Sequence, residues 1–112
     1  MADILFISTA SRLLGMHPQT LRKYERLGLV RPDRTVGSMR LYSPEQIERL
    51  RFIKHLVDER GINLAGVRHL LAVVDAVRRL RPLASGDALS RRGGHGRLLR
   101  ELQHLSEVVG LP

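Results

Sequence analysis

The sequence predicts a mainly α fold with one small β-hairpin, and three observations carry this prediction. Apolar residues recur at helical spacing, between residues that cap helices, in successive segments up to residue 81. One turn-rich run, 29–42, has the composition of a hairpin, and a further apolar repeat lies near the C-terminus. A chain of 112 residues, 43% of them apolar, suits one modest core. We therefore expect a winged helix-turn-helix, with the hairpin as its wing and a C-terminal helix.

The first two helices flank a tight turn that contains glycine. The first helix has an apolar face at helical spacing, formed by Ile7, Ala10, Leu13 and Leu14. Ser8 is its expected N-cap, and Gly15 is its expected stop. Pro18 suits the first position of the second helix, because its missing N–H needs no partner there, and Gly28 closes that helix. Its apolar edge is formed by Leu21, Tyr24 and Leu27. Two short helices around such a turn predict a helix-turn-helix.

The hairpin and the third helix follow directly. Pro32 and Asp33 start a turn, and Gly37 and Ser38 separate two short segments, 34–36 and 39–42, which we expect to pair as the wing. The third helix begins with an N-cap, a first-turn proline and a capping-box glutamine in their expected order, at Ser43, Pro44 and Gln46. One face of the third helix, which runs to about Arg60, is formed by Ile47, Leu50, Ile53, Leu56 and Val57.

The second half of the chain contains a long helix, a linker and a short helix. Asn63 caps the fourth helix and Pro82 breaks it, while its apolar stripe is formed by Leu64, Val67, Leu70, Leu71, Val74 and Val77. We expect a flexible linker over 82–96, which is rich in glycine. A seam with a heptad-like spacing is formed by Leu98, Leu102, Leu105 and Val109. It needs a partner, either the long helix or a second subunit. The expected divisions are 1–76, 77–96 and 97–112.

Composition narrows the function. Lys and Arg number 19 against 11 acidic residues, for a net charge of +8, which favours a polyanionic partner but also fits a basic surface kept for solubility. The absence of cysteine excludes disulfides and thiol chemistry. The five histidines have no metal-ligand spacing, and no nucleophile, base and orienting group can be assembled, so we expect no enzyme, no metal and no cofactor. Without a leader or an apolar membrane span, we expect a cytoplasmic location.

Three runs of sequence resemble the DNA-binding domain of the MerR family of transcriptional regulators. They are GMHPQTLRKYERLGLVRP (15–32), RTVGSMRLYS (34–43) and IERLRFIKHLVDERGINLAGVRHLL (47–71). The segments HPQT (17–20) and GINLAG (61–66) are most similar to the heat-shock repressor branch, HspR. The resemblance implies a homodimeric repressor that binds an inverted-repeat operator at heat-shock or chaperone genes, with a DnaK-type chaperone as possible co-repressor.

Candidate DNA-contacting residues follow from chemistry and from this resemblance. Arg22 can address guanine with its planar fork, and Gln19 can read adenine. The resemblance implies phosphate and flanking-base contacts by His17, Thr20, Lys23 and Tyr24. In the wing it implies contacts by Arg34, Arg40 and Tyr42. Either tyrosine could instead pack in the core. The free N–H groups at Asn63 and Leu64 are a candidate phosphate clamp.

Two other functions stay open at this point. Excisionase-like architectural factors, which bend DNA, can use a similar minimal winged helix, and they bind tandem sites in place of one palindrome. An interaction module could instead use the basic surface and the helix of residues 98–109 to bind an acidic protein. Salt separates this last class, because a protein that neutralises phosphates loses affinity steeply as salt rises.

Overall fold

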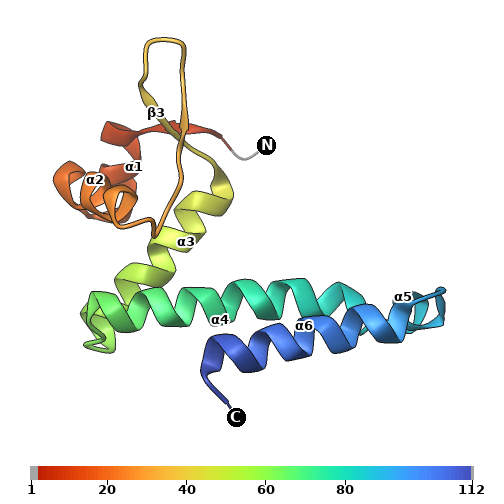
Figure 1. Cartoon of the computed structure of the whole chain (residues 1–112). Coiled ribbons are helices and arrows are strands. Elements are labelled where there is room, and N and C mark those ends of the chain that lie inside the picture. The colour runs from red at the N-terminus through yellow and green to blue at the C-terminus, as the bar shows by residue number, and fades with distance from the viewer. Residues whose placement is uncertain (1–2, 112) are drawn as a thin grey trace. The chain divides into compact units, whose positions relative to one another are not determined.

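The computed structural model describes residues 3–111, so Met1, Ala2 and Pro112 of the predicted divisions lie outside the described residues. The chain forms two compact units, residues 1–62 and residues 63–112. The first unit contains β1 (Leu5–Phe6), α1 (Ile7–Leu14), α2 (Pro18–Arg26), β2 (Asp33–Arg34), β3 (Arg40–Tyr42), α3 (Pro44–Lys54) and a π-helical turn, η1 (His55–Glu59). The second contains α4 (Leu64–Leu83), α5 (Gly86–Ser90) and α6 (Gly94–Val109) (Figure 1). The fold class predicted from the sequence is confirmed.

The sheet of the first unit has three antiparallel strands in the order β1-β3-β2. Leu5 pairs with Tyr42, and Arg34 pairs with Arg40. The hairpin lies where it was expected, but its strands are shorter, because residues 35–39 form the turn: the amide of Thr35 donates to the Met39 carbonyl at 2.9 Å. Strand β1 was not predicted, because a strand of two residues is too short to show an alternating pattern.

The caps show where the helix boundaries were predicted well and where they were not. Ser43 caps α3 as expected, since its hydroxyl accepts from the Gln46 amide at 3.2 Å. The predicted reciprocal bond of the Gln46 side chain is wrong, because that side chain accepts from the Arg31 amide at 3.1 Å. The prediction of Ser8 as the N-cap of α1 is also wrong: the chain passes from β1 directly into the helix, so Phe6 occupies the cap position.

The core of the first unit joins the helix-turn-helix to the hairpin and to α3. Its buried apolar side chains are Ala10, Leu14, Leu21, Tyr24, Leu29, Val30, Tyr42, Ile47, Leu50, Ile53 and Leu56. Two further bonds fasten the connections to α3: Lys54 Nζ donates to the Leu14 carbonyl at 2.8 Å, and Arg49 Nε donates to the Leu29 carbonyl at 2.6 Å. The C-terminal end of α1 and the loop between α2 and β2 are therefore both held against α3.

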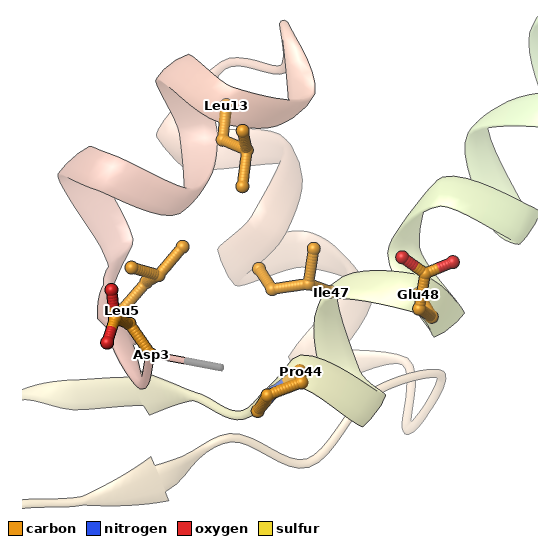
Figure 2. Close-up of a pocket in the computed structure, with 6 residues that line it drawn as sticks. All are labelled: Asp3, Leu5, Leu13, Pro44, Ile47 and Glu48. Atoms are coloured by element: carbon orange, nitrogen blue, oxygen red, sulfur yellow. The ribbon is translucent and has the colours of Figure 1, made fainter. Parts of the chain in front are cut away.

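A depression on the first unit lies between β1, α1 and α3. Figure 2 shows Leu5, Leu13 and Ile47 around it, with the carboxylates of Asp3 and Glu48 at its edges. Its volume is about 320 Å³. Because the charged groups at its edges are acidic, this depression does not suit a phosphate-rich ligand.

In the second unit, α4 and α6 lie side by side and α5 joins them (Figure 1). The prediction of a flexible linker over 82–96 is wrong, because this segment is helical over most of its length. Helix α4 continues through Pro82 to Leu83. The glycines that predicted a linker instead allow a close turn: a Cβ on Gly94 would stand 2.2 Å from the Ala88 carbonyl oxygen. The chain divides after residue 62, whereas the sequence had placed the first division after residue 76.

Candidate nucleic-acid interface

Helix α2 turns one face into the core and the other toward solvent. Leu21 and Tyr24 are buried, at 0% and 6% exposed. The outer face carries the predicted recognition residues, with Gln19 and Lys23 exposed and Thr20 and Arg22 half-exposed. Anchoring one face leaves the polar face presented on a rigid scaffold, as reading a DNA groove requires.

His17 combines a structural role with an exposed position. Its Nδ1 accepts a hydrogen bond from the Gln19 amide at 3.0 Å and so caps α2, a role that the sequence analysis did not predict. In the neutral ring the proton then lies on Nε2. The exposed imidazole therefore has a donor available at the start of the helix, where the N–H groups also favour anions.

The two tyrosines lie where the alternative interpretation placed them. Tyr42 is fully buried, and its hydroxyl has no hydrogen-bond partner among the described residues. Burial raises the pKa of Tyr24, and the charge of Asp58 adds to this. Both rings therefore act as packing residues, and neither presents its face to a ligand.

Charged groups on α2 and the wing act on the pKa of Tyr42. Burial raises the pKa of Tyr42; the positive charge of Arg40 opposes this, Glu25 adds to it, and Arg34 and Arg22 oppose it more weakly. Of the three arginines, Arg40 therefore has the largest effect on the pKa of this hydroxyl.

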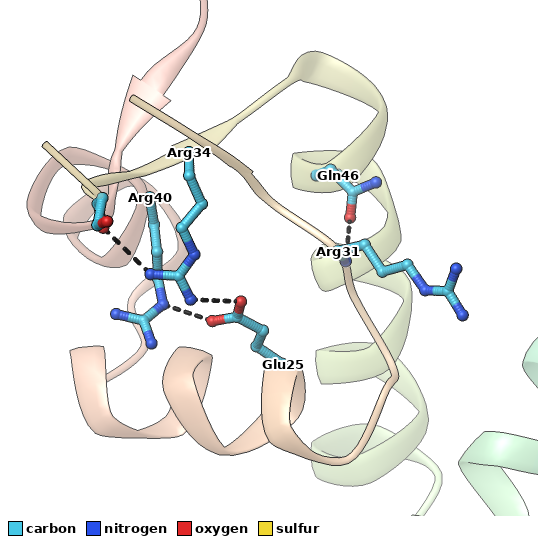
Figure 3. A network of polar contacts seen from close by, with 6 residues as sticks. Glu25, Arg31, Arg34, Arg40 and Gln46 are labelled. Carbon is cyan, nitrogen blue, oxygen red and sulfur yellow. Dashed lines mark hydrogen bonds and ion pairs between the residues drawn. The ribbon is translucent and has the colours of Figure 1, made fainter. Parts of the chain in front are cut away.

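Glu25 joins the wing to α2, and the sequence analysis missed it. Its Oε2 accepts from Arg34 Nη2 at 2.7 Å, and its Oε1 accepts from Arg40 Nε at 2.5 Å (Figure 3). Arg34 Nη1 also donates to the Ser38 carbonyl at 3.1 Å. The one signal available in the sequence was an acidic residue in an otherwise basic helix, which does not reveal a partner 15 positions away.

The remaining predicted residues belong to the second unit. Asn63 caps α4, because its Oδ1 accepts from the Gly66 amide at 2.8 Å, and Leu64 begins the helix. In α6, Leu98 and Leu105 are half-buried, whereas Leu102 and Val109 are each 42% exposed. The phosphate clamp and the dimerisation seam stay predictions.

Other kinds of site find little support in the described residues. No three acidic or histidine side chains within residues 3–111 gather as a metal ion would require. In the same range, every helix is too short or too polar to cross a membrane.

A helix-turn-helix with an arginine-bearing hairpin beside its second helix defines a winged helix-turn-helix domain. Residues 6–73 match the model of the MerR HTH family regulatory proteins. The chain belongs to the MerR family of transcriptional regulators, and the resemblance noted from its sequence is confirmed.

Individual relatives agree with this assignment. The chain is 48% identical over 82 residues, 73% of its length and 54% of the relative's, to a Streptomyces coelicolor protein named as a heat shock protein, HspR. It is 45% identical over 62 residues, 54% of its length and 46% of the relative's, to the mercuric resistance operon regulatory protein of Bacillus cereus. It thus spans about half the length of these curated relatives. The family to which the chain belongs is one of regulatory proteins, in agreement with the expectation that the chain is not an enzyme.

A solved structure has a similar fold. It is the crystal structure of HiNmlR, a MerR family regulator lacking the sensor domain, bound to promoter DNA. The TM-score is 0.61 at 16% sequence identity, and the match covers 96% of this chain and 71% of the other. At this identity the likeness concerns the fold.

Proposed function

We propose that this chain is a sequence-specific DNA-binding transcriptional regulator whose helix α2 enters the major groove while the wing contacts the adjacent backbone. The observation that carries the proposal is the pair of ion pairs by which Glu25 of α2 holds Arg34 and Arg40 of the wing beside the helix that carries Arg22. A net charge of +8 supplies attraction to the polyanion. The crystal structure of HiNmlR, in which a protein of similar fold is bound to promoter DNA, supports DNA as the ligand.

The exposed groups have distinct roles in this proposal. Arg22 and Gln19 read base edges, because their planar groups can form paired hydrogen bonds with guanine and adenine. The groups that bind phosphates and fix the docking register are His17, Thr20, Lys23, Arg34 and Arg40. Tyr24 and Tyr42 support the scaffold from the core. The backbone amides at Asn63 and Leu64 add a phosphate clamp at the start of α4.

The regulator acts as a homodimer on an inverted repeat, so that the two-fold symmetry of the protein matches that of its operator. The exposed Leu102 and Val109 of α6 are the apolar contacts available to a second subunit. Likeness to a protein named as the heat shock protein HspR supports heat-shock or chaperone genes as the targets of repression. A DnaK-type chaperone is the co-repressor in this proposal.

A genome-wide binding map, taken before and after a temperature shift and followed by footprinting of the recovered fragments, tests the proposal. We expect one palindromic element at heat-shock promoters. A string of tandem sites would favour the architectural DNA-bending factor instead. No enrichment of DNA in this map would favour the interaction module.

Paired variants test the roles of individual residues. Arg22→Ala should cost about 1–3 kcal/mol of operator binding and relax base preference at one position per half-site. Arg40→Ala should weaken operator binding without changing the preferred base at any position, because it removes a phosphate contact. Equal, small losses on every DNA tested would show that these roles are wrongly assigned.

A further inference from the structure

The wing carries two like charges in direct opposition. Arg34 and Arg40 face each other across the antiparallel pair of β2 and β3. Side chains at directly opposed positions lie on the same face of the sheet, with Cβ atoms about 4.5–5.5 Å apart, and like charges there repel each other. A hairpin of this sequence on its own would therefore favour arrangements in which the two guanidinium groups diverge.

Glu25 removes this repulsion from outside the hairpin. Each oxygen of its carboxylate accepts from a different arginine, so one acidic group bridges both strands (Figure 3). Glu25 belongs to α2, three residues after Arg22. The bridge therefore couples the position of the wing arginines to the helix that carries the base-reading side chain.

The geometry leaves part of each arginine available to a ligand. The side chains of Glu25 and Arg40 are 21% and 22% exposed, and that of Arg34 is 42% exposed. Figure 3 shows the terminal nitrogens of Arg40 directed away from the carboxylate, which Arg40 contacts through Nε. These terminal nitrogens can therefore donate to a phosphate while the bridge stays intact.

The bridge is charged at neutral pH. Burial raises the pKa of Glu25, but hydrogen bonds from Arg40 and Arg34, together with their charges, outweigh it, and the pKa lies below its ordinary value. Two guanidinium groups and one carboxylate carry a net charge of +1. The wing thus presents one unit of charge less than its arginines would supply without Glu25.

We propose that Glu25 is a positioning residue that sets DNA specificity, by holding Arg34 and Arg40 in one arrangement relative to α2. The inference rests on the proposed function. On an operator, the held arginines meet phosphates only when α2 is in register. On unrelated DNA, the carboxylate withholds a charge that free arginines would use on any backbone.

The expected effect can be worked out from counterion release. Removing the carboxylate adds one charge, and one more neutralised phosphate steepens the slope of log K against log salt by about 0.9. At about 0.15 M salt this raises affinity for unrelated DNA about fivefold. On the operator the same gain is offset, because freed arginines lose conformational entropy when the specific complex orders them again.

The experiment compares Glu25→Gln with Glu48→Gln in the full-length chain. Glu48 is a suitable control, because its change alters net charge equally at an exposed position on α3. The probes are a duplex selected by the wild-type protein from a random-sequence library and the same duplex with scrambled half-sites, each titrated at several salt concentrations. Circular dichroism checks that each variant is folded.

We expect Glu25→Gln to bind the scrambled duplex about fivefold more tightly with a steeper salt slope, and the selected duplex within twofold of wild type. Glu48→Gln should leave both affinities within twofold. Glu25→Asp keeps the charge but shortens the reach to both arginines, so its ratio of specific to non-specific affinity should also fall.

Three results would overturn the inference. The first is an unchanged ratio of specific to non-specific affinity in Glu25→Gln, whether both affinities rise or both fall. It would mean that the substitution acts only through net charge or only through the fold. A full effect of Glu25→Gln in the Arg34→Ala, Arg40→Ala background would mean that Glu25 does not act through the arginines. If the wild-type chain binds no duplex, the proposed function fails as well. Failure of the inference about Glu25 alone is distinguished from this, because the wild-type chain then still binds DNA.

Discussion

Replacing Tyr42 by phenylalanine should stabilise the protein without weakening DNA binding. The ring is 0% exposed and its hydroxyl has no partner among the described residues. An unsatisfied buried hydroxyl costs about 1–3 kcal/mol, and phenylalanine fills the same space without that cost. We therefore expect Tyr42→Phe to raise the free energy of unfolding by about 1–2 kcal/mol, or the Tm by roughly 4–8 °C for each kcal/mol.

The assay is thermal unfolding followed by circular dichroism, with a DNA titration on the same samples. Tyr24→Phe is the matched control: Tyr24 keeps 6% of its surface exposed, and we expect a change within about 0.5 kcal/mol. The reasoning is refuted if Tyr42→Phe leaves the Tm unchanged and lowers operator affinity fivefold or more. That result would mean that the hydroxyl contacts DNA, as the family resemblance had suggested.

Three further predictions concern the rest of the molecule. Gly94→Ala should destabilise the second unit by about 1–3 kcal/mol, because its Cβ would overlap the Ala88 carbonyl. A Cβ at Gly86 meets nothing within 4 Å, so Gly86→Ala should be tolerated, and melting curves of the two variants check this. Because the pKa of Glu25 is lowered in the folded state, its ion pairs stabilise the fold at pH values above the ordinary pKa of glutamate. This stabilisation is lost as the pH falls through the pKa of the folded state. The stability gap between wild type and Glu25→Gln should therefore shrink in acid, and a constant gap from neutral to acidic pH would contradict this. Leu102→Glu places a charge on the exposed seam of α6 and should lower both sedimentation mass and operator affinity, while an unchanged mass would remove this residue from the dimer contact.

Local signals predicted the first unit well. Pro18 and Pro44 lie at the first positions of α2 and α3, and Ser43 caps α3 through the Gln46 amide, as their sequence order indicated. These interactions join residues a few positions apart, so their geometry follows from the order of residues along the chain. The polar face of α2 followed from the same periodicity, because fixing which residues are buried also fixes which are exposed.

Long-range contacts escaped the sequence analysis. Glu25 meets Arg40, 15 residues away, only because the hairpin folds back over α2. Leu5 pairs with Tyr42 across the whole helix-turn-helix, and a strand of two residues has no periodicity to announce it. The glycine-rich run 93–96 indicated a linker, since composition cannot distinguish a mobile glycine from one that permits close packing, as Gly94 does beside Ala88.

The sequence alone therefore determined the family, the helix-turn-helix, the wing and the basic character of the surface, because each depends on local spacing, capping and charge. The tertiary structure decided that Tyr24 and Tyr42 face inward, that Glu25 holds the wing arginines, and that the C-terminal third packs as helices. The physical reason is that burial and ion pairing depend on which segments meet in space. That is decided by the joint packing of the chain, in which each residue's own preference is one small contribution among many.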